Sequence, residues 1–248
     1  MSLFGKYQLS SIKIFLEKPN WKSTLNFLAE GAFRDKFFFF FDTERGQNLS
    51  IYAKNFSDEH ISELQRFIDS LPRHYLGQPE DFLFANFRNC TILSINKIPV
   101  NFDIEIPTDI ENAFDFQKKL GNVIIGALNY NDFFLEEKNR INLALQLVFL
   151  SMIRAKRAEI SKSLKSIPEI QKVDEGLKAF FSEIQNIEKE GNLEKWVVDW
   201  LEITATIKSI SALEFMIESV CQTLEIRSFS KNLTYTLYAI LSDLDCRA

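Results

Sequence analysis

Five consecutive phenylalanines, Phe37 to Phe41, constrain the fold of this chain more than any other feature. An unbroken aromatic run is typical of a strand that is covered on both faces. A polar turn containing Gly46 follows it, and residues 48–54 then alternate apolar and polar side chains, as a strand with one solvated face does. Together these segments predict a hairpin over 35–54 at the centre of a sheet.

The other segments predict strands near the start of the chain and helices after them. Two further strands are indicated at 7–16 and 89–97 by their β-branched and aromatic residues. One helix is predicted over 21–33, and a second begins after the cap residue Ser57 and ends before Pro72. Thr108, with Glu111 three residues on, is the predicted cap of the next helix. From there the apolar spacing stays helical, at 108–129, 135–164, 169–190, 193–207, 210–224 and 230–244.

The predicted fold class is α+β. A small, mostly antiparallel N-terminal sheet with flanking helices is expected to pack on a C-terminal helical block. No linker or change of composition divides the 248 residues into separate domains. We therefore expect one domain, with a sheet-containing part at 1–108 and a helical part at 109–248.

Composition and charge exclude several classes of function. A net charge of -5 leaves no broad cationic field for nucleic acid. No apolar run is long enough to cross a membrane and no signal segment is evident, so a cytoplasmic protein is expected. Three scattered cysteines and two histidines predict neither a disulfide framework nor a metal site. His60 and His74 are interpreted as surface imidazoles.

Motifs for the common cofactors and hydrolases are absent from the sequence. The eight glycines form no phosphate-binding loop, and there is no GxSxG, HExxH or CxxC motif. We expect no cofactor and no metal. The residues by themselves therefore assign no reaction to this protein.

The order of elements and two segments carry a resemblance to a known family. The segments are DKFFFFFDTERGQNLSIYAK, at 35–54, and ALEFMIESVCQTLEIRSFSKNLTYTLYAILSDL, at 212–244. From residue 7 to residue 244 the chain resembles the elimination domain of class I lanthipeptide dehydratases, which also occurs alone as the thiopeptide-type bacteriocin biosynthesis protein. The resemblance implies a lyase-like enzyme that removes glutamate from glutamylated Ser or Thr in a peptide.

The family's charged positions are substituted in this chain. Asn48 stands where the family's strand has its first His, and Ser50 and Tyr52 replace two strand arginines. Cys221 and Gln222 align with an Asn-Arg pair before the last helix. Without these cationic groups a departing carboxylate loses its charge-assisted hydrogen bonds, so elimination by the family's usual mechanism is not expected. The five residues become candidate substrate-binding residues, although they also fit an ordinary strand and helix.

Three hypotheses follow. The first is an enzyme that matures a ribosomally made peptide, by elimination or by a cycloaddition that positioning accelerates, as in relatives that form the nitrogen heterocycle of thiopeptides. The second is a non-catalytic peptide-binding or scaffold subunit, to which an extended peptide adds at a sheet edge. The third is an unrelated helical interaction module. For the first two, the expected partners are a precursor peptide, as leader or modified core, and a separate dehydratase-like glutamylating protein; a homodimer is a possible assembly.

Overall fold

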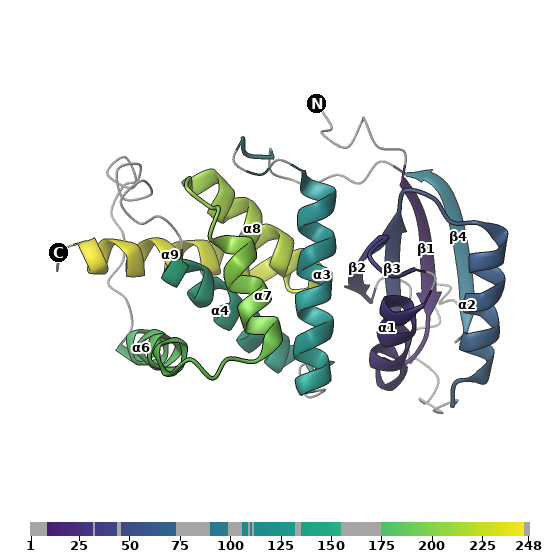
Figure 1. Ribbon diagram of the computed structural model, residues 1–248, viewed down its shortest axis with the longest axis horizontal. Coiled ribbons are helices and arrows are strands. Elements are labelled where there is room, and N and C mark those ends of the chain that lie inside the picture. Colours follow the sequence, from purple (N-terminus) through teal and green to yellow (C-terminus); the bar gives the residue numbers. More distant parts are fainter. Residues whose placement is uncertain are drawn as a thin grey trace.

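The computed structural model describes residues 9–31, 33–43, 46–72, 90–98, 106–108, 110, 112–131, 135–154 and 175–245. It confirms an α+β fold with a small sheet near the N-terminus and helices in the C-terminal part (Figure 1). The strands are β1 (Leu9–Phe15), β2 (Phe37–Asp42), β3 (Asn48–Ala53) and β4 (Thr91–Ile98). They form a four-stranded sheet in the order β2-β3-β1-β4, and all neighbouring strands are antiparallel.

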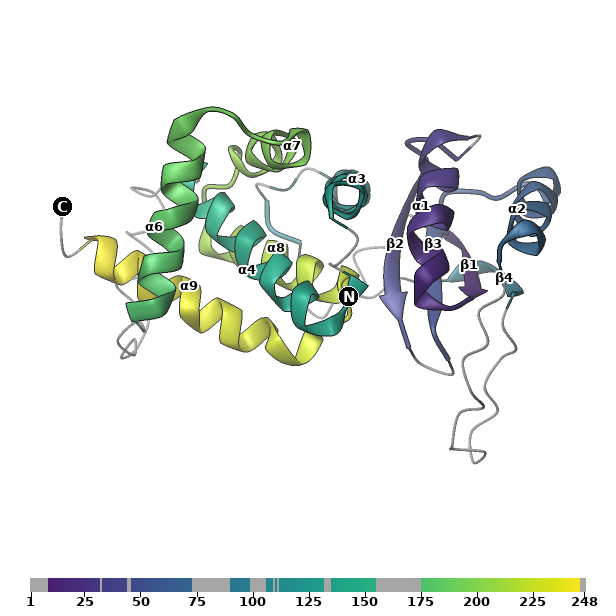
Figure 2. The same ribbon diagram turned by 90° about the horizontal axis from the view of Figure 1, so that it is seen from below.

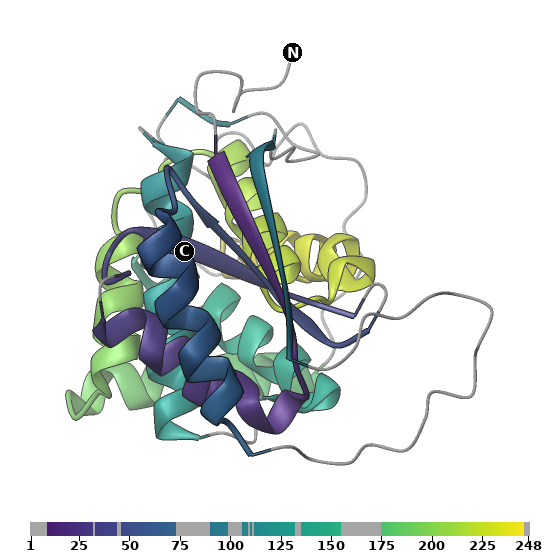
Figure 3. The same ribbon diagram turned by 90° about the vertical axis from the view of Figure 1, so that its right-hand side faces the viewer.

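One face of the sheet is covered by two N-terminal helices. They are α1 (Trp21–Glu30), which follows a short 3-10 helix (Lys18–Asn20), and α2 (Asp58–Ser70). The rings of Phe27 and Phe67 stack with their centroids 4.1 Å apart and so join the two helices. Figure 3 looks onto this arrangement from the side of α2, with the C-terminal helices behind the sheet.

The C-terminal helices form a second layer beside β2. They are α3 (Ala113–Tyr130), α4 (Glu137–Arg154), α6 (Glu175–Glu190), α7 (Lys195–Thr204), α8 (Ile210–Thr223) and α9 (Ser230–Asp245), with a 3-10 turn, η4 (Arg227–Phe229), between the last two. Helix α3 stands between the sheet and the other helices (Figures 1 and 2). It runs along β2, where the ring of Phe114 meets Phe38 edge-on and Gly121 lies against Phe39.

The five phenylalanines of β2 are buried, as their sequence predicts. Each is at most 5% exposed. Phe41 stacks on Trp21 of α1, with centroids 4.8 Å apart, whereas Phe38 points to the opposite face and meets Phe114 of α3. The aromatic run therefore joins α1, on one face of the sheet, to α3, which lies along the β2 edge and contacts Phe38 and Phe39, which point to opposite faces.

Two details of the predicted hairpin are wrong. The hairpin pairs as expected, from Phe37 opposite Ala53 to Asp42 opposite Asn48, but β2 is an edge strand of the sheet and only β3 is interior. Helix α3 covers β2 in place of another strand. The polar side of β3 is also not solvated, because Asn48 and Ser50 are 0% and 2% exposed and bond to neighbouring polar groups.

The start of α3 also differs from the prediction. Asn112 caps this helix, and its side-chain oxygen accepts hydrogen bonds from the backbone N–H groups of Phe114 and Asp115 at 3.0 and 3.3 Å. Thr108 lies outside the helix, because Ile110 N–H donates to the Pro107 carbonyl in a turn that precedes it. The shift removes Ile110 from the helical face on which its spacing had placed it.

The structure tests the prediction for His60, whereas other predictions fall on residues that it does not describe. His60 is half-buried rather than fully solvated: its Nδ1 accepts from the Ser57 N–H at 3.3 Å, which completes the cap of α2. The last part of the predicted helix 135–164, from residue 155, and the first part of the predicted helix 169–190, up to residue 174, lie outside the described residues. His74 and Cys246 lie outside them as well. Among the helices that the structure describes, none combines the length and apolarity needed to cross a membrane.

Candidate functional site

Three of the five candidate residues share one face of β3. Asn48, Ser50 and Tyr52 are alternate residues of this strand, so their side chains lie on the same side of the sheet. Their partners in β1 are Phe15, Lys13 and Ser11, in that order, and their partners in β2 are Asp42, Phe40 and Phe38. This face is the one opposite α1 and α2, and it holds a polar group on each of three adjacent strands.

A hydrogen-bonded network connects these polar groups. Lys13 Nζ lies 3.0 Å from Asp42 Oδ2. The Ser50 hydroxyl lies 3.4 Å from the same carboxylate oxygen and 3.2 Å from Asn48 Oδ1. We call Lys13, Asp42, Asn48, Ser50 and Tyr52 the sheet-face cluster. Lys13 and Asp42 are 28% and 23% exposed, so the network is reachable from solvent at its charged end.

Tyr52 is held in an aromatic stack within this cluster. Its ring lies parallel to Phe38, with centroids 5.1 Å apart, and against Phe40 at 5.3 Å. Burial, and then the nearby Asp42 carboxylate, raise the pKa of the phenol above its usual value of 10.0, whereas a hydrogen bond with Ser50 and the charge of Arg227 lower it. The net shift is upward, so the phenol is a neutral hydrogen-bonding group at physiological pH.

The helical layer contacts the hairpin through Glu225, at the end of β2 where Asp42 lies. Glu225 follows α8, and its carboxylate accepts from Arg140 Nη1 of α4 at 3.0 Å and from the Thr43 hydroxyl after β2. Arg140 is 3% exposed and Glu225 is 22% exposed. The exposed Arg227, two residues further along, acts electrostatically on Tyr52. The polar face of β3 and the link between α8 and α9 therefore lie next to each other.

Cys221 and Gln222 lie in α8 and contribute to the site through their backbone. Both are buried, at 0% and 6% exposure. Their carbonyl oxygens accept the N–H groups of Ile226 and Glu225, at 2.8 and 3.3 Å, and so shape the link that carries Glu225 and Arg227. Both residues belong to α8, whereas the other three candidate residues belong to β3. Burial raises the pKa of the Cys221 thiol to about 12, so it is not a thiolate nucleophile near neutral pH.

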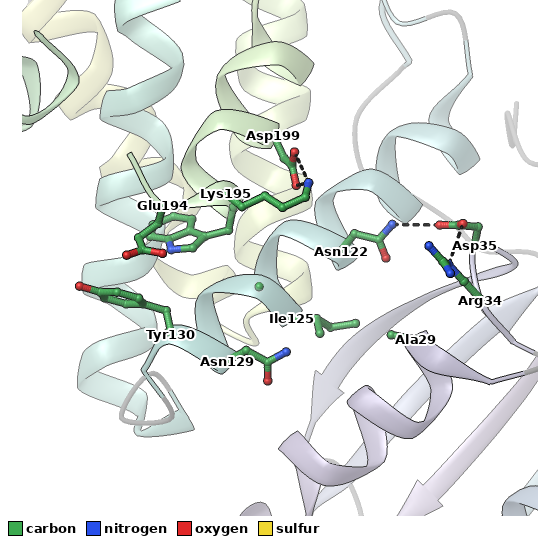
Figure 4. Close-up of a pocket in the computed structure, with 12 residues that line it drawn as sticks. Ala29, Arg34, Asp35, Asn122, Ile125, Asn129, Tyr130, Glu194, Lys195 and Asp199 are labelled. Atoms are coloured by element: carbon green, nitrogen blue, oxygen red, sulfur yellow. Dashed lines mark hydrogen bonds and ion pairs between the residues drawn. The ribbon is translucent and has the colours of Figure 1, made fainter. Parts of the chain in front are cut away.

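A hollow lies away from the sheet-face cluster, between α1, α3 and α7 (Figure 4). Its volume is about 600 Å³, and Asn122, Asn129 and Tyr130 of α3 line one side. Two ion pairs border it: Lys195 lies 2.7 Å from Asp199, and Arg34 lies 3.7 Å from Asp35. We call this hollow the α3–α7 groove. It contains none of the five residues that the sequence singled out.

Sequence reasoning missed the charged members of the site. The alternation in Leu9–Phe15 places Ser11 and Lys13 on one strand face, so this pattern could have indicated Lys13. No local pattern marks Glu225 or Arg227, because their place beside the hairpin depends on how α8 packs against β2. Among the residues that the structure describes, no group of three or more His, Cys, Asp or Glu side chains is arranged to hold a metal ion.

Comparisons with known proteins give one informative result. Neither a protein-family model nor a curated protein matches the sequence. Among solved structures, the chain is similar to the pyridine synthase TbtD from thiomuracin biosynthesis, with a TM-score of 0.54 and 11% sequence identity. The match covers 95% of this chain and 97% of that protein. At this identity the comparison establishes a shared fold along nearly the whole length of both chains.

Proposed function

We propose that this protein acts on or binds a modified precursor peptide in the maturation of a ribosomally synthesised peptide natural product. The observation that carries the proposal is the fold likeness, over 95% of the chain, to a pyridine synthase of thiomuracin biosynthesis. The resemblance of residues 35–54 and 212–244 to peptide-modifying elimination domains supports the same class of substrate. The extent of this likeness favours peptide maturation over an unrelated helical module.

The sheet-face cluster is the proposed peptide-binding site. Its partly exposed groups are the protonated phenol of Tyr52 and the ion pair of Lys13 and Asp42, whose charges neutralise each other, while the buried Ser50 and Asn48 support them from beneath. Such groups suit the amide N–H and C=O groups of a peptide, which need hydrogen bonds but no charge. The partly exposed Tyr52 and Lys13 give a ligand access from the solvent side.

The chemistry of the cluster favours positioning over proton transfer. Glutamate elimination needs a base for an α-proton and cations for the leaving carboxylate. Within the described residues the cluster contains no histidine, and the pKa of Tyr52 lies above the range of an effective base at neutral pH. A cycloaddition between two parts of one bound peptide needs mainly that the reacting atoms be held together. We therefore favour ring formation by positioning.

A non-catalytic peptide-binding subunit is the second candidate function. The same neutral, paired chemistry favours it, because a recognition site needs no titrating group. In this case the cluster would select the modified peptide and present it to a separate enzyme. The two candidates share the ligand and differ only in whether its covalent structure changes.

Binding and mass should be measured together. The purified protein is incubated with the candidate precursor peptide in unmodified, glutamylated and dehydrated forms. An intramolecular cycloaddition by itself keeps the mass of the peptide, so the enzyme is supported by loss of the leader segment or of water that accompanies ring formation, or by a new ring chromophore at unchanged mass. Binding with neither change supports the recognition subunit. If none of the peptide forms binds, the proposal is wrong.

Matched variants locate the site. Tyr52→Phe and Ser50→Ala each remove one hydrogen-bonding group from the cluster and should weaken peptide binding by about 2- to 10-fold, the effect of one net hydrogen bond. Tyr130→Phe makes the same change in the α3–α7 groove, at a residue that is 63% exposed, and should leave the affinity unchanged. The reverse pattern would move the site to the groove.

A further inference from the structure

Glu225 has an unusual backbone conformation for a residue with a side chain. Its φ of 57° lies in the left-handed region, which is usually occupied by glycine at the end of a helix. The backbone is fixed there by two hydrogen bonds, from Glu225 N–H to the Gln222 carbonyl and from Ile226 N–H to the Cys221 carbonyl. Glycine would meet this requirement without strain, so the glutamate side chain at this position calls for a separate explanation.

The side chain of Glu225 connects three segments. One carboxylate oxygen accepts from Arg140 Nη1 at 3.0 Å, and the other accepts from the Thr43 hydroxyl. Arg140 belongs to α4, Thr43 follows β2, and Glu225 belongs to the link between α8 and α9. With Arg140 only 3% exposed, this charge-assisted bond is shielded from water.

Two of the segments joined by Glu225 adjoin the sheet-face cluster. Thr43 directly follows Asp42, whose carboxylate holds Lys13 and lies near Ser50. In the link between α8 and α9, Arg227 comes two residues after Glu225, and its guanidinium acts on the Tyr52 phenol. The Glu225 carboxylate therefore connects the end of β2, which carries Asp42, to the link that carries Arg227.

We propose that Glu225 is a positioning residue of the peptide-binding site, which holds the α8–α9 link against the hairpin and so sets the place of Arg227 relative to Tyr52. The inference rests on the proposed function in taking the sheet-face cluster as the site. It adds a separate claim about the geometry of that site. Glu225 acts through Arg227 and Thr43 rather than by touching the peptide.

The titration of Tyr52 provides a readout that needs no peptide. The phenol carbon of each tyrosine is labelled with 13C, the Tyr52 signal is assigned with Tyr52→Phe, and its pKa is measured by NMR in the full-length chain. Arg227→Gln should raise the pKa of Tyr52, because a positive charge that lowers it is removed. This variant sets the size of the effect expected when Arg227 is lost.

Removing the Glu225 side chain should have the same effect as removing Arg227. Glu225→Gly keeps the left-handed backbone without strain and deletes the carboxylate, so the link is freed from Arg140 and Thr43. We expect a rise in the Tyr52 pKa comparable to that in Arg227→Gln, and no additional rise in the double variant. A carboxylate that acted only as a nearby charge would give the opposite sign, because its removal lowers the pKa of a phenol.

Controls separate this claim from misfolding and from the proposed function. Glu202→Gln removes an exposed carboxylate of α7 and should leave the Tyr52 titration unchanged. Far-UV circular dichroism shows whether Glu225→Gly is folded, and Glu225→Gln, which keeps the side-chain shape, serves as a second variant. An unchanged or lowered Tyr52 pKa in a folded Glu225→Gly protein would overturn the inference. Failure of every peptide form to bind the wild-type protein would overturn the proposed function while leaving this result intact.

Discussion

At the scale of single residues, Tyr52 shows how position in the sheet decides the chemistry of a side chain. Its ring is stacked on Phe38, and its hydroxyl lies near both Asp42 and Ser50. Burial and the Asp42 carboxylate act together on the pKa, and they outweigh the opposing influence of Ser50 and Arg227. The result is a phenol that remains protonated over the whole physiological range.

Replacing the neighbouring carboxylate tests this electrostatic account. In Asp42→Asn the pKa of Tyr52 should fall toward 10.0, since the variant removes a negative charge and frees the positive charge of Lys13. The measurement is an NMR titration of the labelled phenol. Asp199→Asn, which alters an ion pair in the α3–α7 groove, should not change the Tyr52 titration. Equal shifts in both variants would contradict the account.

The raised pKa of the Cys221 thiol predicts how the free energy of unfolding changes with pH. Its pKa is about 12 in the folded protein and near 9.0 when unperturbed, so the folded state holds the proton more tightly. The free energy of unfolding should therefore be unaffected below pH 9 and fall as the pH rises from about 9 toward 12. The full difference corresponds to about 4 kcal/mol as an upper bound.

Denaturant unfolding at two pH values measures this contribution. Between about pH 8 and pH 10.5, the wild-type protein should lose more stability than Cys221→Ala, which has no thiol to titrate. The alanine variant is expected to be less stable at the lower pH, because it leaves a small cavity in the core. Parallel pH dependence in the two proteins would show that the thiol does not contribute.

At the scale of elements, α3 lies between the sheet and the other helices (Figures 1 and 2). Its two interior glycines face different neighbours. A Cβ at Gly126 would lie 2.8 Å from Trp196 Cβ of α7, whereas a Cβ at Gly121 would lie 3.4 Å from the ring of Phe39 in β2. The helix is therefore packed more tightly against α7 than against the strand.

The two glycines form a matched pair of variants. Gly126→Ala should destabilise the protein by about 1–3 kcal/mol, because α3 and α7 must move apart to accept the methyl group. Gly121→Ala makes only an ordinary contact and gains helix propensity, so it should be neutral or stabilising by up to about 1 kcal/mol. Thermal and denaturant unfolding of both variants would check the order, and equal losses would refute the close α3–α7 contact.

At the scale of the whole molecule, the two layers are held together by an apolar contact and by a hydrogen bond from Thr43 to Glu225, which is itself ion-paired within the helical layer. The aromatic strand β2 packs on α3, and Arg140 of α4 reaches Glu225, which in turn binds Thr43 of the hairpin. The ion pair is asymmetric, since Arg140 is 3% exposed and Glu225 is 22% exposed. Its partners should therefore respond unequally to substitution.

The loss of the carboxylate should cost more than the loss of the guanidinium. Glu225→Gln leaves a buried cation without a counter-charge, which costs about 3–5 kcal/mol when nothing compensates it. Arg140→Met leaves a carboxylate that water can reach, so the loss should be smaller. The double variant should recover part of the stability lost in Glu225→Gln. Thermal unfolding of the three variants gives the comparison, and a larger loss in Arg140→Met would contradict it.

The sequence predicted the kinds of element and their order because those depend on local patterns. An unbroken aromatic run, β-branched and aromatic segments and one period-2 alternation located all the described strands within a few residues, and helical spacings located most helices. The start of α3 was misjudged, since Thr108 and Asn112 are both competent caps and the turn from Pro107 to Ile110 decides between them. The shared face of Asn48, Ser50 and Tyr52 also follows from the sequence, through strand alternation.

By itself, then, the sequence determined an α+β fold and a buried aromatic strand, because side-chain periodicity and burial are local properties. Only the tertiary structure placed β2 at the sheet edge beneath α3, and brought Lys13, Asp42 and Arg227 to Tyr52. These groups come from strands and a helix link that are distant in the chain. Lys13 is brought to Asp42 by the pairing of β1 and β2 with β3, and Arg227 by the packing of the helical layer on the sheet. No local pattern encodes either of these.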